Sequence, residues 1–98
     1  MTTPLNDAEI SEWLARVNGW QRDGGQISKL FQVDSYLAGL ALATAIGTIC
    51  EGLDHHPNMA IGWRKVAVTF TTHDAGNKLS HKDFEAAERI DALGYPRP

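Results

Sequence analysis

The segment from Lys65 to Thr72 alternates between two kinds of side chain, and this alternation constrains the fold more than any other feature of the sequence. Every second position on one side is apolar and bulky, and these residues are Val66, Val68 and Phe70. The residues between them are smaller or polar, namely Ala67, Thr69 and Thr71. Because a period of two is that of a β-strand with one buried face, the segment predicts a sheet covered on one side.

Capping signals mark the starts of the predicted helices. Asn6 and Glu9 have the spacing of a capping box, in which each residue bonds the backbone of the other. Ser80 and Asp83 repeat this spacing near the other end of the chain, and Pro57 ends the middle helix. The predicted helices run from Asp7 to Val17, from a cap at Asp34 or Ser35 to about Asp54, and from Ser80 to Gly94.

Between the helices lie two pairs of predicted strands, each pair joined by a turn. The predicted strands are Trp20 to Arg22, Gln26 to Asp34, Asn58 to Gly62 and Lys65 to Thr72. Because local hairpins are antiparallel, the order α-β-β-α-β-β-α predicts an α+β fold with one antiparallel sheet and helices packed on one face. The length suits one domain spanning residues 1–98.

The predicted core comes from one side of each element. The first hairpin is expected to contribute Ile27, Phe31 and Val33, and the third helix Phe84, Ala87 and Ile90. The stripe expected on the middle helix is Tyr36, Leu40, Ala43, Gly47, Cys50 and Asp54. Tryptophans at such positions fill cores more often than they bind ligands, and this applies to Trp13, Trp20 and Trp63.

Charge and composition exclude several classes of function. Lys and Arg total 9 against 12 Asp and Glu, and the basic residues are scattered, so direct nucleic-acid binding is not expected. The single cysteine, Cys50, has no partner for an intrachain disulfide. Residues 1–6 lack a signal-peptide pattern, and the apolar stretch from Tyr36 to Cys50 is shorter than the ~20 residues of a membrane helix. We therefore expect a soluble, cytoplasmic protein that does not contact a membrane.

Three histidines at the ends of predicted elements indicate acid/base chemistry. His55 and His56 stand where the middle helix stops, and His73 stands where the last strand stops. Histidine exchanges protons near neutral pH, and the ends of rigid elements hold side chains both exposed and fixed. Adjacent imidazolium ions repel each other, whereas Glu51 and Asp54 favour the charged form, so the pair suits divided roles.

Two other readings of the histidines remain open at this point. Histidines at a helix end often cap its free carbonyls. A metal site is the second alternative, although neither Cys50 nor a carboxylate completes a recognised zinc spacing. The fourth histidine, His81, falls in the first turn of the third helix and is expected at the surface.

Several motifs, taken in chain order, resemble the signature of the pterin-4a-carbinolamine dehydratases. The matching segments are Gly19-Trp20, Phe31-Gln32-Val33-Asp34, Glu51-Gly52-Leu53-Asp54-His55-His56-Pro57, Trp63-Arg64-Lys65-Val66, Thr72-His73-Asp74, and Leu79-Ser80 with Asp83. They span nearly the whole chain. The family fold implied by this resemblance is a four-stranded antiparallel sheet with three helices on one side, which agrees with the order of elements predicted above.

The resemblance implies a hydro-lyase that converts 4a-hydroxytetrahydropterin, such as 4a-hydroxytetrahydrobiopterin, to quinonoid dihydropterin with no metal or organic cofactor. This step recycles tetrahydrobiopterin, so an aromatic amino-acid hydroxylase is the implied metabolic client. By matching position, His55 and His73 are the implied acid/base pair, and the third catalytic histidine, His56, mainly binds and orients the substrate. The other implied substrate-binding residues are Trp20, Glu51, Asp54, Pro57, Thr71, Thr72 and Asp74.

The sequence departs from the family pattern at two points. A short double-glycine turn usually follows the Thr-His-Asp motif, whereas here the segment 75–78 is one residue longer. We expect this change to alter how the loop that carries Asp74 sits. Met59 also stands where an aromatic residue is common, which softens the expected wall beside the histidine pair.

Relatives of this fold also serve as dimerisation cofactors of transcription factors and as assembly factors, so a non-catalytic interaction module is the alternative function. The completeness of the polar motif, with Glu51, Asp54 and Thr72 beside the histidines, favours the enzyme. The family resemblance implies a homodimer or homotetramer joined through the middle helix, where small residues such as Gly39 and Gly47 permit close approach. The same surface could instead pack on the chain's own sheet.

Overall fold

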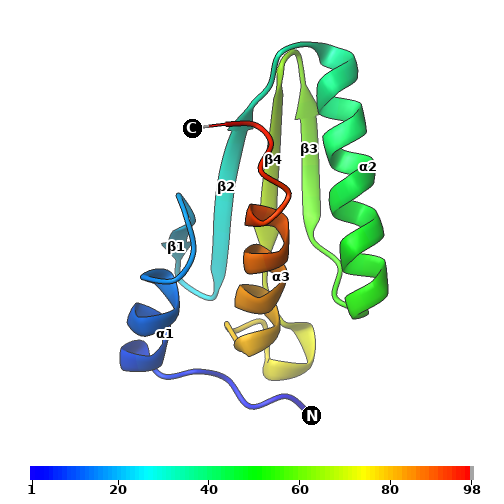
Figure 1. Cartoon of the computed structure of the whole chain (residues 1–98). Helices are drawn as coiled ribbons and strands as arrows, with labels where there is room; N and C mark the ends of the chain where they lie inside the picture. The colour runs from blue at the N-terminus through cyan, green and yellow to red at the C-terminus, as the bar shows by residue number, and fades with distance from the viewer. Residues whose placement is uncertain (98) are drawn as a thin grey trace.

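A four-stranded antiparallel sheet organises the fold, in the spatial order β1-β2-β4-β3 (Figure 1). The structure is a computed structural model that describes residues 1–97. Its elements are α1 (Asp7–Leu14), β1 (Gln21–Asp23), β2 (Gln26–Gln32), α2 (Tyr36–Leu53), β3 (Asn58–Gly62), β4 (Lys65–Phe70), the 3-10 turn η1 (His73–Ala75) and α3 (His81–Asp91). The three α-helices lie on one face of the sheet (Figure 1), which confirms the predicted α+β fold.

The alternating segment forms β4, one of the two central strands, which begins at Lys65 as predicted but ends at Phe70 and not at Thr72. Val66, Val68 and Phe70 are fully buried. In the antiparallel pairing with β2, Phe31 lies opposite Val66 and Ile27 opposite Phe70, so large apolar side chains from neighbouring strands meet on the covered face. The predicted inward residues of the first hairpin and of α3 are also buried: Ile27, Phe31, Val33, Phe84, Ala87 and Ile90.

Helix α1 begins at the predicted capping box. The side-chain oxygen of Asn6 accepts from the Glu9 backbone N–H at 2.9 Å, and a Glu9 carboxylate oxygen accepts from the Asn6 N–H at 2.9 Å. The helix ends at Leu14, earlier than predicted. Trp13 stacks on Phe84 of α3 with ring centroids 5.6 Å apart, so it joins the core as expected.

The buried side of α2 differs from the predicted stripe. The helix buries Gly39, Leu42, Ala43, Ile46 and Cys50, whereas Tyr36 is half exposed. Only two members of the predicted stripe, Ala43 and Cys50, are among the buried residues. Because α2 is apolar or small nearly all round, the spacing of its apolar residues did not identify the inner side.

Close approach to the sheet explains which side of α2 is buried. A Cβ at Gly39 would lie 3.4 Å from the side chains of Val33 and Val66, so a larger residue there would crowd the sheet. The small residues Gly39 and Ala43 therefore pack on the chain's own sheet. By length and composition alone, α2 with its 18 residues is also long and apolar enough to cross a membrane, a test that buried core helices pass as well.

Trp63 is not a core residue, and this expectation from the sequence was wrong. Gly62 pairs with Lys65, which leaves Trp63 and Arg64 as a two-residue turn at the tip of the second hairpin. The indole projects beyond the sheet with 75% of the residue exposed, and the Arg64 guanidinium lies 5.4 Å from its ring centroid.

Candidate active site

A hollow of about 440 Å³ at the end of α2 gathers most of the residues that the sequence predicts for the site. Its walls come from the connection between α2 and β3, from the chain that leaves β4, and from the first turn of α3. The lining residues are Asp54, His55, His56, Pro57, Asn58, Thr71, Thr72, His73, Asp74 and Lys82.

The end of α2 sets the direction of the two adjacent histidines. Asp54 takes a left-handed backbone conformation, with φ 52° and ψ 41°, which turns the chain away from the helix axis. The His55 backbone N–H donates to the Cys50 carbonyl at 3.1 Å, so backbone groups close the helix end. The histidine side chains bond carboxylates instead of the free helix carbonyls, which argues against simple capping.

His55 is buried and tightly held. Its Nε2 lies 2.7 Å from a carboxylate oxygen of Asp83 on α3, and Asp83 is fully buried. The imidazole also stacks on the ring of Phe70, with centroids 5.7 Å apart and planes 8° apart. A carboxylate accepts from Nε2, so the proton sits there in the neutral ring and Nδ1 is the nitrogen left for chemistry.

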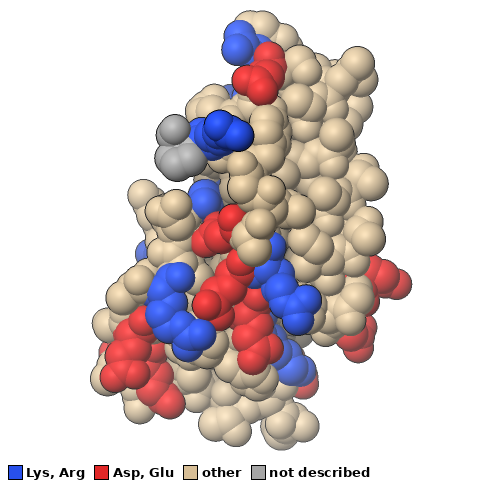
Figure 2. All heavy atoms as spheres, in the orientation of Figure 1, with Lys and Arg blue, Asp and Glu red and all other residues tan. Residues whose placement is uncertain are grey.

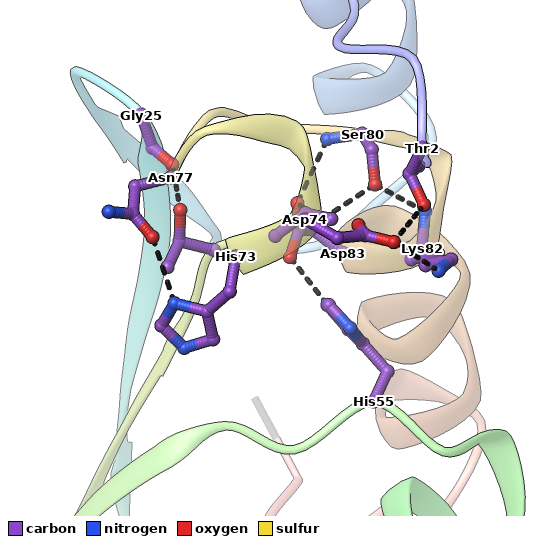
Figure 3. Close-up of polar contacts among 11 residues, drawn as sticks. Thr2, Gly25, His55, His73, Asp74, Asn77, Ser80, Lys82 and Asp83 are labelled. Carbon is purple, nitrogen blue, oxygen red and sulfur yellow. Dashed lines mark hydrogen bonds and ion pairs between the residues drawn. The ribbon is translucent and has the colours of Figure 1, made fainter.

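Asp83 is the centre of a hydrogen-bond network in which its partners donate to the carboxylate (Figure 3). Its second carboxylate oxygen accepts from the Thr72 hydroxyl at 2.8 Å and from the Ser80 backbone N–H at 2.9 Å. The Ser80 and Thr72 hydroxyls are 2.6 Å apart, so Ser80 donates to Thr72 once Thr72 donates to Asp83. The network fixes the position of the carboxylate that faces His55.

His56 lies in a different environment from its neighbour. Its Nε2 is 2.6 Å from a carboxylate oxygen of Glu51, and both side chains are more than half exposed. Glu51 lies outside the hollow but contacts a residue that lines it. Exposed pairs of this kind contribute little to stability.

His73 enters the hollow from the chain that follows β4. It begins η1 and is exposed, and its Nδ1 lies 2.8 Å from the side-chain oxygen of Asn77 (Figure 3). Thr71, just before it, donates its hydroxyl to the Gly25 carbonyl at 2.6 Å. The loop after β4 is thereby tied to the turn between β1 and β2.

Asp74 lies on the rim of the hollow and binds the N-terminal segment. The Thr2 hydroxyl donates to its carboxylate at 3.0 Å, and the Lys82 ammonium lies 3.7 Å away. These contacts, the Thr2 hydrogen bond first, hold the pKa of Asp74 below its ordinary value despite some desolvation.

Burial raises the pKa of the Cys50 thiol to about 11, so this cysteine is an unreactive core residue.

The chain is similar to proteins of one known family. A profile described as pterin 4 alpha carbinolamine dehydratase matches residues 3–93. A protein of Natronomonas pharaonis is 46% identical over 95% of this chain and 98% of its own length, and one of Roseiflexus sp. (strain RS-1) is 44% identical over 95% and 99%. The names of both assign them provisionally as pterin-4-alpha-carbinolamine dehydratases.

The chain belongs to the pterin-4a-carbinolamine dehydratase family. The resemblance seen in the sequence is thus confirmed.

Two solved structures with 26% sequence identity share the family fold. A transcriptional coactivator/pterin dehydratase from Brucella melitensis superposes with a TM-score of 0.87, covering 93% of this chain and 98% of the other. A pterin dehydratase-like protein identified as a RuBisCO assembly factor in the alpha-carboxysome superposes with a TM-score of 0.63, covering 78% and 87%.

Trp20, which the resemblance places in the pterin site, does not line the hollow formed by the described residues. It is buried, with its ring centroid 5.7 Å from that of Phe70, and its indole N–H donates to Asp91 at 3.0 Å. We correct the expectation that its ring forms a wall of the hollow: Trp20 is a core residue, as its position after a helix suggests. It lies behind Phe70, on which His55 stacks.

Sequence reasoning missed three residues of this dehydratase-family site. Asp83 was recognised as part of a helix cap and of the family motif but not as a partner of His55, because nothing in its local spacing signals a contact 28 positions away. Asn58 and Lys82 also line the hollow. Their only sequence signal is their place beside Pro57 and at the start of α3.

The arrangement can support proton transfer at two points of one ligand. His55 and His73 reach the same hollow from separate segments, and each has one ring nitrogen engaged by a protein oxygen. The other nitrogen of each ring remains to exchange protons. Within residues 1–97, no group of three or more His, Cys, Asp or Glu side chains is placed to hold a metal ion.

Proposed function

We propose that this protein is an enzyme that dehydrates 4a-hydroxytetrahydropterins, such as 4a-hydroxytetrahydrobiopterin, to quinonoid dihydropterins. The observation that carries the proposal is the convergence of His55 and His73 on one polar hollow, in a chain of this family. Loss of the 4a-hydroxyl as water needs a proton on the departing oxygen, and the adjacent ring nitrogen must lose one. Two histidines can supply both transfers, each worth a factor of ~10² to 10⁴.

The roles of the two histidines follow from their partners. We assign to His55, whose Nε2 is bonded to the Asp83 carboxylate, the delivery of a proton to the departing hydroxyl. His73 then takes the proton from the ring nitrogen. After one turnover His55 has lost a proton and His73 has gained one. Transfer of a proton from His73 to His55 through solvent restores both residues.

The remaining residues of the hollow would bind and orient the pterin. His56, fixed by Glu51, offers a polar contact, and Pro57 offers an apolar one. The carboxylates and hydroxyls that can bond the amino and carbonyl groups of the ring are those of Asp54, Thr71, Thr72 and Asp74. We place the activity in the recycling of tetrahydrobiopterin in the cytoplasm, with an aromatic amino-acid hydroxylase as the client.

The test measures dehydration by the purified protein of 4a-hydroxytetrahydropterin generated by a hydroxylase. The wild type should raise the rate above the spontaneous one, and His55→Ala and His73→Ala should each lower it. His81→Ala is the matched control, because His81 is an exposed histidine outside the hollow. Full activity in the double variant His55→Ala/His73→Ala would refute the acid/base assignment.

The outer surface of α2 supports a second proposal, self-association of the chain, which holds whether or not the protein is an enzyme. The helix carries a single charged residue, Glu51, and Figure 2 shows the surface over most of α2 free of Lys, Arg, Asp and Glu. Leu37 is 74% exposed on it. An uncharged surface of this extent favours association, and we propose that a second copy of the chain covers it in a homodimer or homotetramer.

Leu37→Glu tests the association, because it places a charge on the exposed side of α2 without touching the hollow. Sedimentation should show oligomers for the wild type and a smaller species for the variant. Glu85→Lys on the exposed side of α3 is the control for a change of surface charge. A monomeric wild type would refute self-association and leave the dehydratase test unaffected.

A further inference from the structure

The loop that carries His73 is closed by its own backbone. The Asn77 N–H donates to the Thr72 carbonyl and the Thr72 N–H donates to the Lys78 carbonyl, both at 3.1 Å. Gly76 and Asn77 both take left-handed conformations, with φ 73° and φ 59°. Asparagine tolerates this region better than other residues with a side chain, so the turn and its Asn77 suit each other.

This closure carries the Asn77 side chain back over the histidine at the start of the loop. Its amide oxygen lies 2.8 Å from Nδ1 of His73, four residues earlier (Figure 3). Among the described side chains, Asn77 is the one that bonds the His73 ring. An amide oxygen only accepts, so Nδ1 must carry the proton.

The turn between β1 and β2 supports Asn77 from the other side. A Cβ on Gly25 would lie 2.3 Å from the Asn77 carbonyl oxygen, so the two backbones touch and only glycine fits. The Gly25 carbonyl accepts from the Thr71 hydroxyl at 2.6 Å, which fixes this contact in place. The position of Asn77 therefore depends on a strand turn that lies far away in the sequence.

We propose that Asn77 is a positioning residue that holds neutral His73 in the Nδ1–H tautomer, leaving Nε2 as the unprotonated nitrogen facing the substrate. This inference rests on the proposed dehydratase function, in which His73 takes a proton. The longer loop, which departs from the double-glycine turn common in the family, thus supplies an orienting group. A ring held in one tautomer and one orientation presents its base without a prior proton shift or rotation.

The deciding experiment is long-range ¹H–¹⁵N NMR of the histidine rings in the full chain without substrate, at a pH where the rings are neutral. The His73 signals are assigned by their loss in His73→Gln. In the wild type, Nδ1 should be the protonated nitrogen. Asn77→Gly keeps the left-handed turn but removes the acceptor, so its His73 should shift toward the Nε2–H form; Asn77→Asp restores an acceptor and should restore Nδ1–H.

Kinetics then connect the tautomer to the reaction. Asn77→Gly should lower kcat about 3- to 10-fold, the size expected for one lost hydrogen bond, with KM changed less than about twofold. Gly25→Ala should reproduce part of this effect by displacing Asn77. Either an Nε2–H tautomer in wild-type His73 or an unchanged tautomer in Asn77→Gly would overturn the proposal. Since the spectra need no turnover, an inactive protein with Nδ1–H on His73 would refute the dehydratase function and leave the tautomer assignment standing.

Discussion

The two histidines assigned to proton transfer are held in opposite ways. His55 is buried, stacked on Phe70 and bound to a carboxylate that has no exposed surface. His73 is exposed on a short loop and is oriented by one neutral amide, that of Asn77. One residue is part of the core, whereas the other is attached to its edge.

The contrast teaches that the two sides of the hollow contribute differently to the stability of the fold: the His55 side is part of the buried core and the His73 side is not. On the His55 side, a change in a side chain leaves buried polar groups without partners, which costs far more than the bond itself contributes. On the His73 side, water can replace any contact that is lost. Substitutions on the two sides should therefore differ in what they damage.

The largest effect is expected from Asp83→Ala. Removal of this carboxylate leaves His55, Thr72 and the Ser80 N–H without their buried acceptor. The free energy of unfolding, measured by urea denaturation, should fall by about 3 to 5 kcal/mol, as for other broken buried pairs.

Asp74→Ala is the control for Asp83→Ala, because it removes an exposed carboxylate from the same hollow. Its unfolding free energy should change far less than that of Asp83→Ala, because water can replace the contacts of an exposed carboxylate. Equal losses in the two variants would show that the His55 side is no more rigid than the His73 side.

A smaller effect on stability separates the two histidines directly. His55→Ala should cost about 1 to 3 kcal/mol, since it leaves the buried Asp83 carboxylate short of one donor. His73→Ala, at an exposed position, should stay within about 0.5 kcal/mol of the wild type. Thermal and urea unfolding of both variants, beside their activities, would break the comparison if His73→Ala proved the less stable.

The smallest effect concerns the rim, where Thr2→Val should raise the pKa of Asp74 toward its ordinary value. The Thr2 hydrogen bond is the largest single cause of the lowered pKa, and the Lys82 ammonium also lowers it, so Lys82→Met should shift the pKa in the same direction. The folded-state pKa lies below the unfolded one. The contact therefore adds stability above the unfolded pKa, and this contribution is lost as the pH falls through the folded one.

A ¹³C titration of the Asp74 carboxyl group measures these shifts. An unchanged pKa in Thr2→Val would mean that the N-terminal segment does not touch the rim in solution.

The elements of the fold could be predicted from sequence where a local rule acts alone. The alternation that ends at Phe70 fixes a strand, and the capping boxes at Asn6 and Ser80 fix two helix starts, because each depends on neighbours within four residues. The inner side of α2 could not be predicted, since its small apolar residues offer no contrast between sides. Trp63 was wrongly predicted to be a core residue, because the exposure of a hairpin tip depends on whether another segment packs over it, and no local pattern reports this.

The candidate site was likewise predictable only where local sequence patterns are enough. His55, His56 and His73 could be selected because histidines at the ends of predicted elements are recognisable in the sequence, and all three line the hollow. The partner that holds His55 was not predictable, because its contact forms only when α3 packs beside the end of α2. The same holds for Asn77, whose turn was expected but whose bond to His73 requires the loop to close on itself.

The capping box at the start of α3 has a consequence for how relatives of this protein should be interpreted. The Asp83 carboxylate that holds His55 also bonds the backbone of Ser80 and thereby begins the helix. A relative without the proposed dehydratase activity would still need that helix, so selection for folding alone would keep the aspartate. The presence of this aspartate in a homologue is therefore weak evidence of activity. Under the proposed mechanism, the more informative positions are His73 and Asn77, which the fold does not require.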